Sequence, residues 1–189
     1  GSIGGRHLDF EPRLAEGLKR GLEEAMRRSG WHDKHGKLPF GRGIGVACGF
    51  FISGSALPIH WNERPGSTVR MTLEFDGAIT VYSGASDIGQ GSSTLLTQVV
   101  AEVLMLPMVR IRVIATDSAL TPKDNGSYSS RVSFMVGNAA LRAAEELKRV
   151  LVAAAAKALQ VTPEEVEWAG ERCAVVGTDK SLDFAQVVE

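Results

Sequence analysis

The sequence predicts an α+β fold, in which a mainly antiparallel sheet is covered by packed helices. Two segments of alternating polarity, 68–75 and 78–83, flank the pair Asp76-Gly77, and this arrangement is a strong signal for a β-hairpin. Two longer segments, 92–105 and 132–159, carry apolar residues at helical spacing. The chain has 189 residues, which is enough to bury a substantial core.

Residues 1–42 are expected to form a peripheral part of the molecule. An amphipathic helix is predicted over Pro12–Arg28. Its apolar face is formed by residues at helical spacing: Leu14, Leu18, Leu22 and Met26. The segment 29–42 is polar and contains Gly and Pro, which is typical of a connector. His32 and His35 are interpreted as loop histidines and no metal site is predicted, because no further Cys or His completes one.

Residues 43–189 are predicted to form the main domain. The continuous apolar run Ile44–Ile52 (IGVACGFFI) is bounded by glycines and predicts a buried strand. In the hairpin, alternation places one set of side chains on a single face: Val69, Met71, Leu73 and Phe75. Both turn residues, Asp76 and Gly77, are expected to adopt positive φ.

Helices and strands then alternate. A glycine-rich loop, Ser83–Gly91 (SGASDIGQG), precedes the first long helix, for which Ser92 and Ser93 are N-cap candidates. A strand is predicted over Met108–Ala115, because apolar and polar residues alternate there. The polar loop Thr116–Ser130 leads into the second long helix.

The C-terminal part predicts smaller elements. The sequence Thr162-Pro163-Glu164-Glu165 is a capping box with proline at the first helical position, so a short helix is expected to begin there. A hairpin with strands Val166–Trp168 and Cys173–Val176 is predicted around Gly170, followed by a helix over Ser181–Val188.

Composition excludes several classes of partner. A net charge of −1 argues against a general nucleic-acid or anionic-membrane partner. No stretch approaches the ~20 apolar residues of a membrane span. Cys48 and Cys173 lie far apart and are interpreted as buried thiols in a reducing compartment, which predicts a cytoplasmic location.

Two loops are candidates for a binding site, because each leads into the start of a helix, although glycine-rich turns and serine caps also occur for purely structural reasons. In Ser83–Gly91, glycines let a ligand approach the backbone, free N–H groups at the helix start favour an anion, and the Gln90 amide can donate and accept. In 125–133, serine hydroxyls, backbone amides and the charge of Arg131 can hold a phosphate. Neither loop has the spacing of a Walker or Rossmann motif.

These loops resemble, in order, those of a known enzyme family. The end of the first loop, Asp-Ile-Gly-Gln-Gly, resembles the Gly-Gln-Gly loop of the xanthine oxidase, aldehyde oxidase and carbon monoxide dehydrogenase large subunits. The segment Gly126–Ala139 (GSYSSRVSFMVGNA) resembles their second cofactor loop and is most similar to the 4-hydroxybenzoyl-CoA reductase and carbon monoxide dehydrogenase-like branches. The resemblance covers roughly Gly43–Leu159.

The resemblance implies a molybdenum–molybdopterin cofactor, in some members extended as a cytosine dinucleotide. It implies contacts with the cofactor from Gly89, Gln90, Gly91, Ser129, Ser130, Arg131 and Val132. Phe50 and Phe51 lie in a stretch that approaches the substrate pocket in the family, although two phenylalanines in an apolar run are commonly core residues.

The resemblance also implies what this chain lacks. Family members carry a catalytic glutamate in a Gly-Glu-rich motif nearer the C-terminus, and nothing here matches it, so no catalytic residue is assigned. We therefore expect a fragment of a molybdenum oxidoreductase that is inactive alone. Its partners would be the rest of the same subunit and the iron–sulfur and flavin subunits or domains. The substrate class, an aromatic, heterocyclic, aldehyde or aromatic acyl-CoA compound, is not specified by this segment.

Two other interpretations stay open at this point. The chain could be a non-catalytic module that uses the fold to bind another anion or a protein. It could also be a phosphate-binding domain unrelated to molybdenum enzymes, in which case the isolated chain would bind simple nucleotides.

Overall fold

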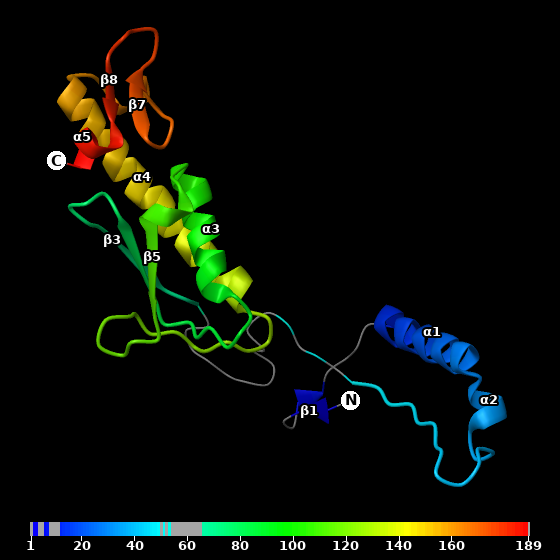
Figure 1. Cartoon of the computed structure of the whole chain (residues 1–189). Coiled ribbons are helices and arrows are strands. Elements are labelled where there is room, and N and C mark those ends of the chain that lie inside the picture. The colour runs from blue at the N-terminus through cyan, green and yellow to red at the C-terminus, as the bar shows by residue number, and fades with distance from the viewer. Residues whose placement is uncertain are drawn as a thin grey trace. The chain divides into compact units, whose positions relative to one another are not determined.

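The computed structural model describes residues 2–3, 6–7, 12–49, 51, 53 and 66–188. The chain divides into two compact units, which are described separately. The first comprises residues 1–52 and 58–61, and the second comprises residues 53–57 and 62–189 (Figure 1). None of the helices in the described ranges is both long enough and apolar enough to cross a membrane.

The first unit contains the predicted amphipathic helix. Strands β1 (Ser2–Ile3) and β2 (Arg6–His7) pair antiparallel, and helix α1 covers Pro12–Ser29. Gly30, with φ 66°, separates α1 from the short helix α2 (Trp31–Lys34). The helix predicted over residues 12–28 is therefore confirmed.

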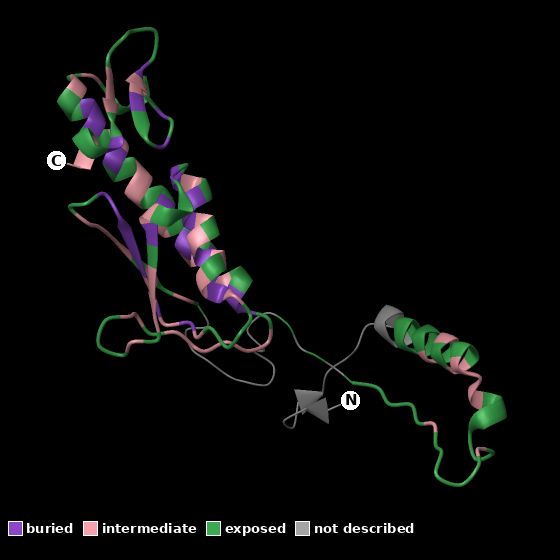
Figure 2. Ribbon diagram, viewed as in Figure 1, coloured by how far each residue is buried: buried purple, intermediate pink, exposed green. Residues whose placement is uncertain are grey.

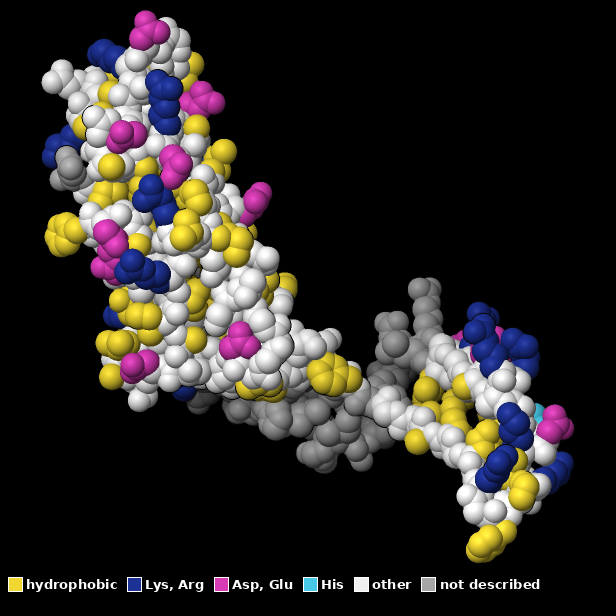
Figure 3. Space-filling model, in the orientation of Figure 1, with side chains coloured by type: hydrophobic (Ala, Val, Ile, Leu, Met, Phe, Trp, Pro, Cys, Tyr) yellow, Lys and Arg dark blue, Asp and Glu magenta, His cyan; other side chains and the backbone are white. Residues whose placement is uncertain are grey.

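The buried strand predicted over Ile44–Ile52 is not found in the described part of that range, residues 44–49 and 51, and there the prediction was wrong. Residues 44–49 form no strand, and all but Ile44 are exposed. Val46–Gly49 instead borders a pocket of ≈ 360 Å³ together with Leu18, Leu22 and Ala25 of α1. Figure 3 shows hydrophobic side chains gathered along this unit. An apolar run forms a buried strand only where it can pair with the edge strand of a sheet. The strands described in this unit are two residues long, which is too short to pair with such a run.

The second unit contains the predicted hairpin within a three-stranded sheet. Strand β3 (Val69–Leu73) pairs antiparallel with β4 (Ile79–Ser83), and β4 pairs parallel with β5 (Ile111–Ala115). β5 begins three residues later than predicted, because Met108–Arg110 forms a 3-10 turn, η1, after Pro107.

The hairpin turn differs from the predicted one. Gly77 donates its N–H to the Glu74 carbonyl (2.9 Å) and has φ 75°, whereas Asp76 does not adopt positive φ. This is a three-residue loop in which only the last residue is left-handed. Phe75 consequently lies in the turn and is 105% exposed, so its predicted place on the apolar face was wrong.

Two long helices cover the sheet, as predicted. Helix α3 (Ser92–Leu104) connects β4 to β5, and α4 (Gly137–Leu159) follows a π-helical turn, η2 (Val132–Val136). α3 and α4 pack against each other, α4 contacts β3, and α3 contacts β5. Figure 2 shows the buried residues on the sheet and the facing sides of these helices. Buried alanines of α4 allow the close approach: Ala140, Ala144 and Ala155.

A second small sheet follows α4. The predicted capping box is present, since the Thr162 N–H donates to Glu165 Oε2 (2.9 Å), and Pro163–Glu165 forms a 3-10 turn, η3. Strands β6 (Val166–Trp168), β7 (Arg172–Val175) and β8 (Ser181–Asp183) are antiparallel neighbours in that order.

The last helix is shorter than predicted. Residues 181–183 pair with β7, so α5 begins only at Phe184 and covers Phe184–Val188. All strand pairings that the structure describes are antiparallel except β4 with β5. The α+β fold with a mainly antiparallel sheet is therefore confirmed.

Candidate functional site

The two loops that sequence analysis identified leave the sheet at the same edge. Because β4 and β5 are parallel neighbours, their carboxyl ends lie together. The loop 84–91 follows β4 and the loop 116–131 follows β5. The N–H of Thr116 also donates to the Ser83 carbonyl (3.1 Å), which ties the two loop origins together. In α/β structures, the carboxyl edge of parallel strands is where ligands commonly bind.

The two loops contact each other directly. Ser127 Oγ donates a hydrogen bond to the Ser86 carbonyl (2.6 Å). A Cβ atom on Gly84 would lie 2.3 Å from the Pro122 carbonyl oxygen and 3.0 Å from Asp124 Cβ, so only glycine permits this approach. Residues far apart in sequence thus form one continuous surface.

The first loop is organised around the Asp87 carboxylate. It accepts hydrogen bonds from the N–H groups of Gly89 (3.0 Å), Gly91 (3.2 Å) and Ser93 (3.2 Å). These bonds, led by that from Ser93, lower the pKa of Asp87 below its ordinary value. The N–H groups expected to be free for an anion are therefore partly occupied, which sequence analysis missed because Asp87 lies outside ordinary capping spacing. The N-cap residue is Gly91, and neither Ser92 nor Ser93.

The side-chain amide of Gln90 stabilises the same loop through two hydrogen bonds. Its Nε2 donates to the Ser86 carbonyl (2.9 Å), and its Oε1 accepts from the Ile88 N–H (2.6 Å). Gly89 and Gly91 are left-handed, with φ 98° and 80°, and no atom lies within 4 Å of a Cβ built on either. A ligand can therefore approach the backbone closely at both glycines.

The second loop ends in unusual backbone geometry. Ser129 and Ser130 are consecutive left-handed residues with φ 49° and 51°, and the π-helical turn beginning at Val132 follows directly. Left-handed non-glycine residues and π-turns both concentrate at functional sites. Ser130 is exposed, Ser129 is half-buried, and the Val132 side chain is buried. Both serines are thus at least partly accessible where the loop meets the helix.

Arg131 is placed differently from the serines. Its side chain is 0% exposed, and Nη1 pairs with Asp124 Oδ1 (2.8 Å) and donates to the Gly126 carbonyl (2.9 Å). In this structure the guanidinium does not face solvent, so its expected contact with a phosphate stays a prediction. Asp124 was not identified from the sequence, since no periodic or motif spacing relates it to Arg131.

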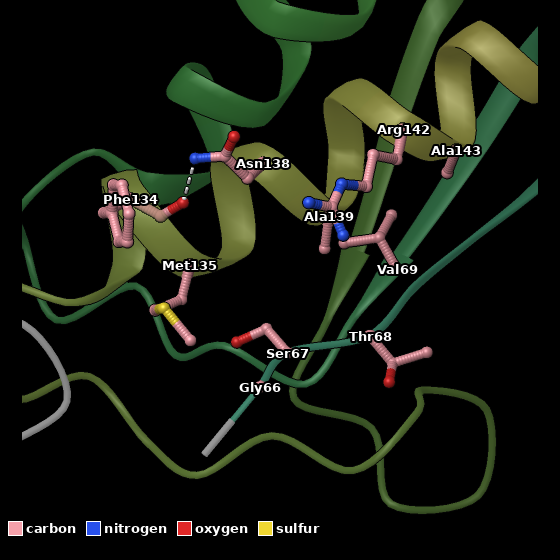
Figure 4. A pocket seen from close by; sticks show the side chains of 10 residues that line it. All are labelled: Gly66, Ser67, Thr68, Val69, Phe134, Met135, Asn138, Ala139, Arg142 and Ala143. Atoms are coloured by element: carbon pink, nitrogen blue, oxygen red, sulfur yellow. Dashed lines mark hydrogen bonds between the residues drawn. The ribbon is translucent and has the colours of Figure 1, made fainter. Parts of the chain in front are cut away.

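A pocket of ≈ 530 Å³ opens beside the start of the second long helix. Figure 4 shows it between the chain entering β3 and the first turns of α4. Phe134, Asn138 and Arg142 recur at four-residue spacing and line one side, a signal that was readable in the sequence but was not used. The other lining residues are Gly66, Ser67, Thr68, Val69, Met135, Ala139 and Ala143.

Some predicted residues lie elsewhere or cannot be placed. Phe50 lies outside the described residues. Phe51 is described and 72% exposed, and its predicted role in a substrate pocket stays a prediction. His35 stacks on Trp31, with ring centroids 4.3 Å apart. Among the described residues, no group of three or more His, Cys, Asp or Glu side chains is arranged to hold a metal ion.

Comparisons with known proteins agree on one family. A family model described as a molybdopterin cofactor-binding domain matches residues 22–189. The chain is 39% identical to the xanthine dehydrogenase molybdenum-binding subunit of Escherichia coli O157:H7, over 76% of this chain and 19% of that protein. It is 31% identical to the 6-hydroxypseudooxynicotine dehydrogenase complex subunit gamma of Paenarthrobacter nicotinovorans, over 87% of this chain and 20% of that protein.

A solved structure shows the same likeness. The reconstituted CO dehydrogenase from Oligotropha carboxidovorans superimposes with a TM-score of 0.61 and 25% identity, over 65% of this chain and 15% of that chain. The matched region thus spans 19% and 20% of the length of the two relatives above.

Proposed function

This chain belongs to the molybdopterin cofactor-binding domain family, within the xanthine oxidase family of molybdenum enzymes, and from this premise we propose that its two adjoining loops bind the molybdenum cofactor. The observation that carries the proposal is the meeting of the loops 84–91 and 116–131 at the carboxyl edge of β4 and β5. The cofactor would lie against this joint surface.

The residues present fit such a group. Gly89 and Gly91 leave open space above the backbone, which a flat pterin or its phosphate could approach. Ser129 and Ser130, at the end of the second loop, supply hydroxyl donors and acceptors. The buried Val132 side chain leaves only its backbone for contact with a ligand.

Each residue then has a distinct task. The two glycines permit close approach, Gln90 holds the loop between them in shape, and the two serines orient the phosphate part. When bound, the cofactor supplies the electron transfer that hydroxylation or the reverse reduction requires. We propose an aromatic, heterocyclic or aldehyde substrate, with aromatic acyl-CoA thioesters included.

We also propose that the catalytic glutamate lies outside this chain, which would make the chain inactive alone. We do not assign that role to Glu171, which follows a glycine but lies beyond β6 and pairs with Arg110 (3.1 Å). The proposed partners are the rest of the large subunit and iron–sulfur and flavin subunits. The name of one relative, a subunit of a dehydrogenase complex, supports an assembly of several subunits.

A matched pair of glycine substitutions tests cofactor binding. Gly91 and Gly177 are both left-handed, with φ 80° and 75°, and both have open space at Cβ, but only Gly91 lies in the loops. We expect the subunit carrying Gly91→Val to lose bound pterin, measured by its fluorescence after release, and Gly177→Val to retain it. Equal pterin content in the two variants would contradict the proposal and favour a module for another anion.

A further inference from the structure

Arg131 lies at the centre of a buried network that joins the second loop to the chain entering β3. Its Nη2 donates to Ser67 Oγ (2.7 Å) and to the Gly66 carbonyl (3.3 Å), at the chain entering β3. Its Nη1 bonds Asp124 and the Gly126 carbonyl in the second loop. Ser67 Oγ in turn donates to Asp124 Oδ2 (2.8 Å), which closes a ring of three side chains.

This network also reaches the first loop, although Arg131 itself does not. Asp124 lies against Gly84, where a Cβ atom would meet it at 3.0 Å. Gly126, whose N–H donates to Asp124 Oδ1 (2.8 Å), is followed by Ser127, which bonds the Ser86 carbonyl. Gly66 and Ser67 also line the ≈ 530 Å³ pocket. One buried ion pair therefore fixes both loops and one wall of the pocket.

We propose that Arg131 and Asp124 are positioning residues, which set the relative placement of the two cofactor loops and do not themselves contact the ligand. A guanidinium with its planar fork can hold several acceptors in fixed directions, which suits this task better than an ammonium group. Desolvation offsets much of the attraction within a buried ion pair, so the role that we propose for this pair is geometric and not one of net stabilisation. The ligand part of this inference rests on the proposed function above.

Hydrogen exchange tests the positioning role without any ligand. In Arg131→Lys, we expect faster amide exchange in residues 84–91, which the guanidinium does not touch, and little change in residues 145–159. The control is Leu151→Ala, which weakens the buried core of α4 and is expected to show the opposite pattern. If Arg131→Lys does not fold, Ser67→Ala removes two bonds of the network without removing a charge. Uniform acceleration, or unchanged exchange in residues 84–91, would overturn the proposal.

The direction in which one substitution changes the affinity for pyrophosphate distinguishes a positioning role from direct contact with the ligand. If Arg131 bound the ligand, Asp124→Asn would release its positive charge and strengthen the binding of inorganic pyrophosphate. If the pair positions the loops, the same change weakens binding, and we expect a loss of about 10- to 100-fold, the range known for residues that orient metal ligands. Asp179→Asn, an equal change of charge at an exposed turn, should leave the affinity unaltered.

Calorimetric titration of the whole chain with pyrophosphate measures this effect. Tighter binding by Asp124→Asn would overturn the positioning role. If the unmodified chain binds no pyrophosphate, the proposed function loses support, while the exchange experiment still decides whether Arg131 and Asp124 position the loops.

Discussion

Single residues decide how the first loop is shaped. The Asp87 carboxylate takes the place that was expected for an external anion before the start of α3. It accepts hydrogen bonds from three backbone N–H groups. An acid in this place also interacts favourably with the helix dipole. The loop is thereby ordered before any ligand arrives, and its open side lies at Gly89 and Gly91.

Asp87→Asn should therefore loosen the loop in a pH-dependent manner. The folded-state pKa of Asp87 is lowered from its ordinary value of 3.8, so the ionised form stabilises the folded chain. That stabilisation is fully present above the pKa that Asp87 has in the unfolded chain. It is lost as the pH falls through the lower pKa that Asp87 has in the folded chain. Urea unfolding should show the variant less stable than the parent at neutral pH, with the difference vanishing in acid below the folded pKa. A pH-independent difference would show that the carboxylate charge is not the cause.

At the scale of elements, the small C-terminal sheet is attached to the end of α3. Trp168 Nε1 donates to the Leu104 carbonyl (2.8 Å), and the Trp168 ring packs edge-on against Phe184. Gly170 lies so close that a Cβ atom would be 1.9 Å from the Met105 carbonyl oxygen. The β6–β7 turn therefore holds the end of the helix that begins at the first loop.

Gly170→Ala should break this attachment. The added methyl group overlaps backbone atoms, so either β6–β7 or the end of α3 must shift, at a cost of about 1–3 kcal/mol. Gly177→Ala is the matched control, because it has similar φ (75° against 73°) but no atom near its Cβ. Thermal unfolding of both variants measures the difference. An equal loss of stability would mean that backbone strain, and not the contact with Met105, accounts for the effect.

At the scale of the whole molecule, the two loops proposed to bind the cofactor and the described pocket beside α4 both belong to the second unit. That unit also contains the main hydrophobic core, formed between the three-stranded sheet, α3, α4 and the C-terminal elements. Both the core and the loop surface are therefore built from the same part of the chain. The first unit has α1 as its main helix.

Residues 62–189 should consequently fold without the first unit. We expect this segment to retain a cooperative thermal transition at nearly the temperature of the whole chain, because its core residues are all present. Calorimetry of the two proteins makes the comparison. A shortened chain without a cooperative transition would show that the first unit contributes to the same core, and the division at residue 42 predicted from the sequence would then also fail.

Local signals were sufficient for most of the elements. Asp76-Gly77 between alternating segments predicted the hairpin, helical spacing predicted α1, α3 and α4, and the Thr162–Glu165 pattern predicted a capped turn. The ordered pair of loops also indicated the family. These features depend on residues within a few positions of one another, so periodicity and motif spacing reveal them.

Tertiary structure decided the features that depend on distant partners. In the run that begins at Ile44, the described residues 44–49 and 51 form no strand and all but Ile44 are exposed, although the composition suits a buried strand. Arg131 turned inward because Asp124 and Ser67 form a buried acceptor site for it, and Ser67 is 64 residues away. Whether a charged side chain faces a ligand or the interior depends on which partners the fold brings to it, and no local spacing records that.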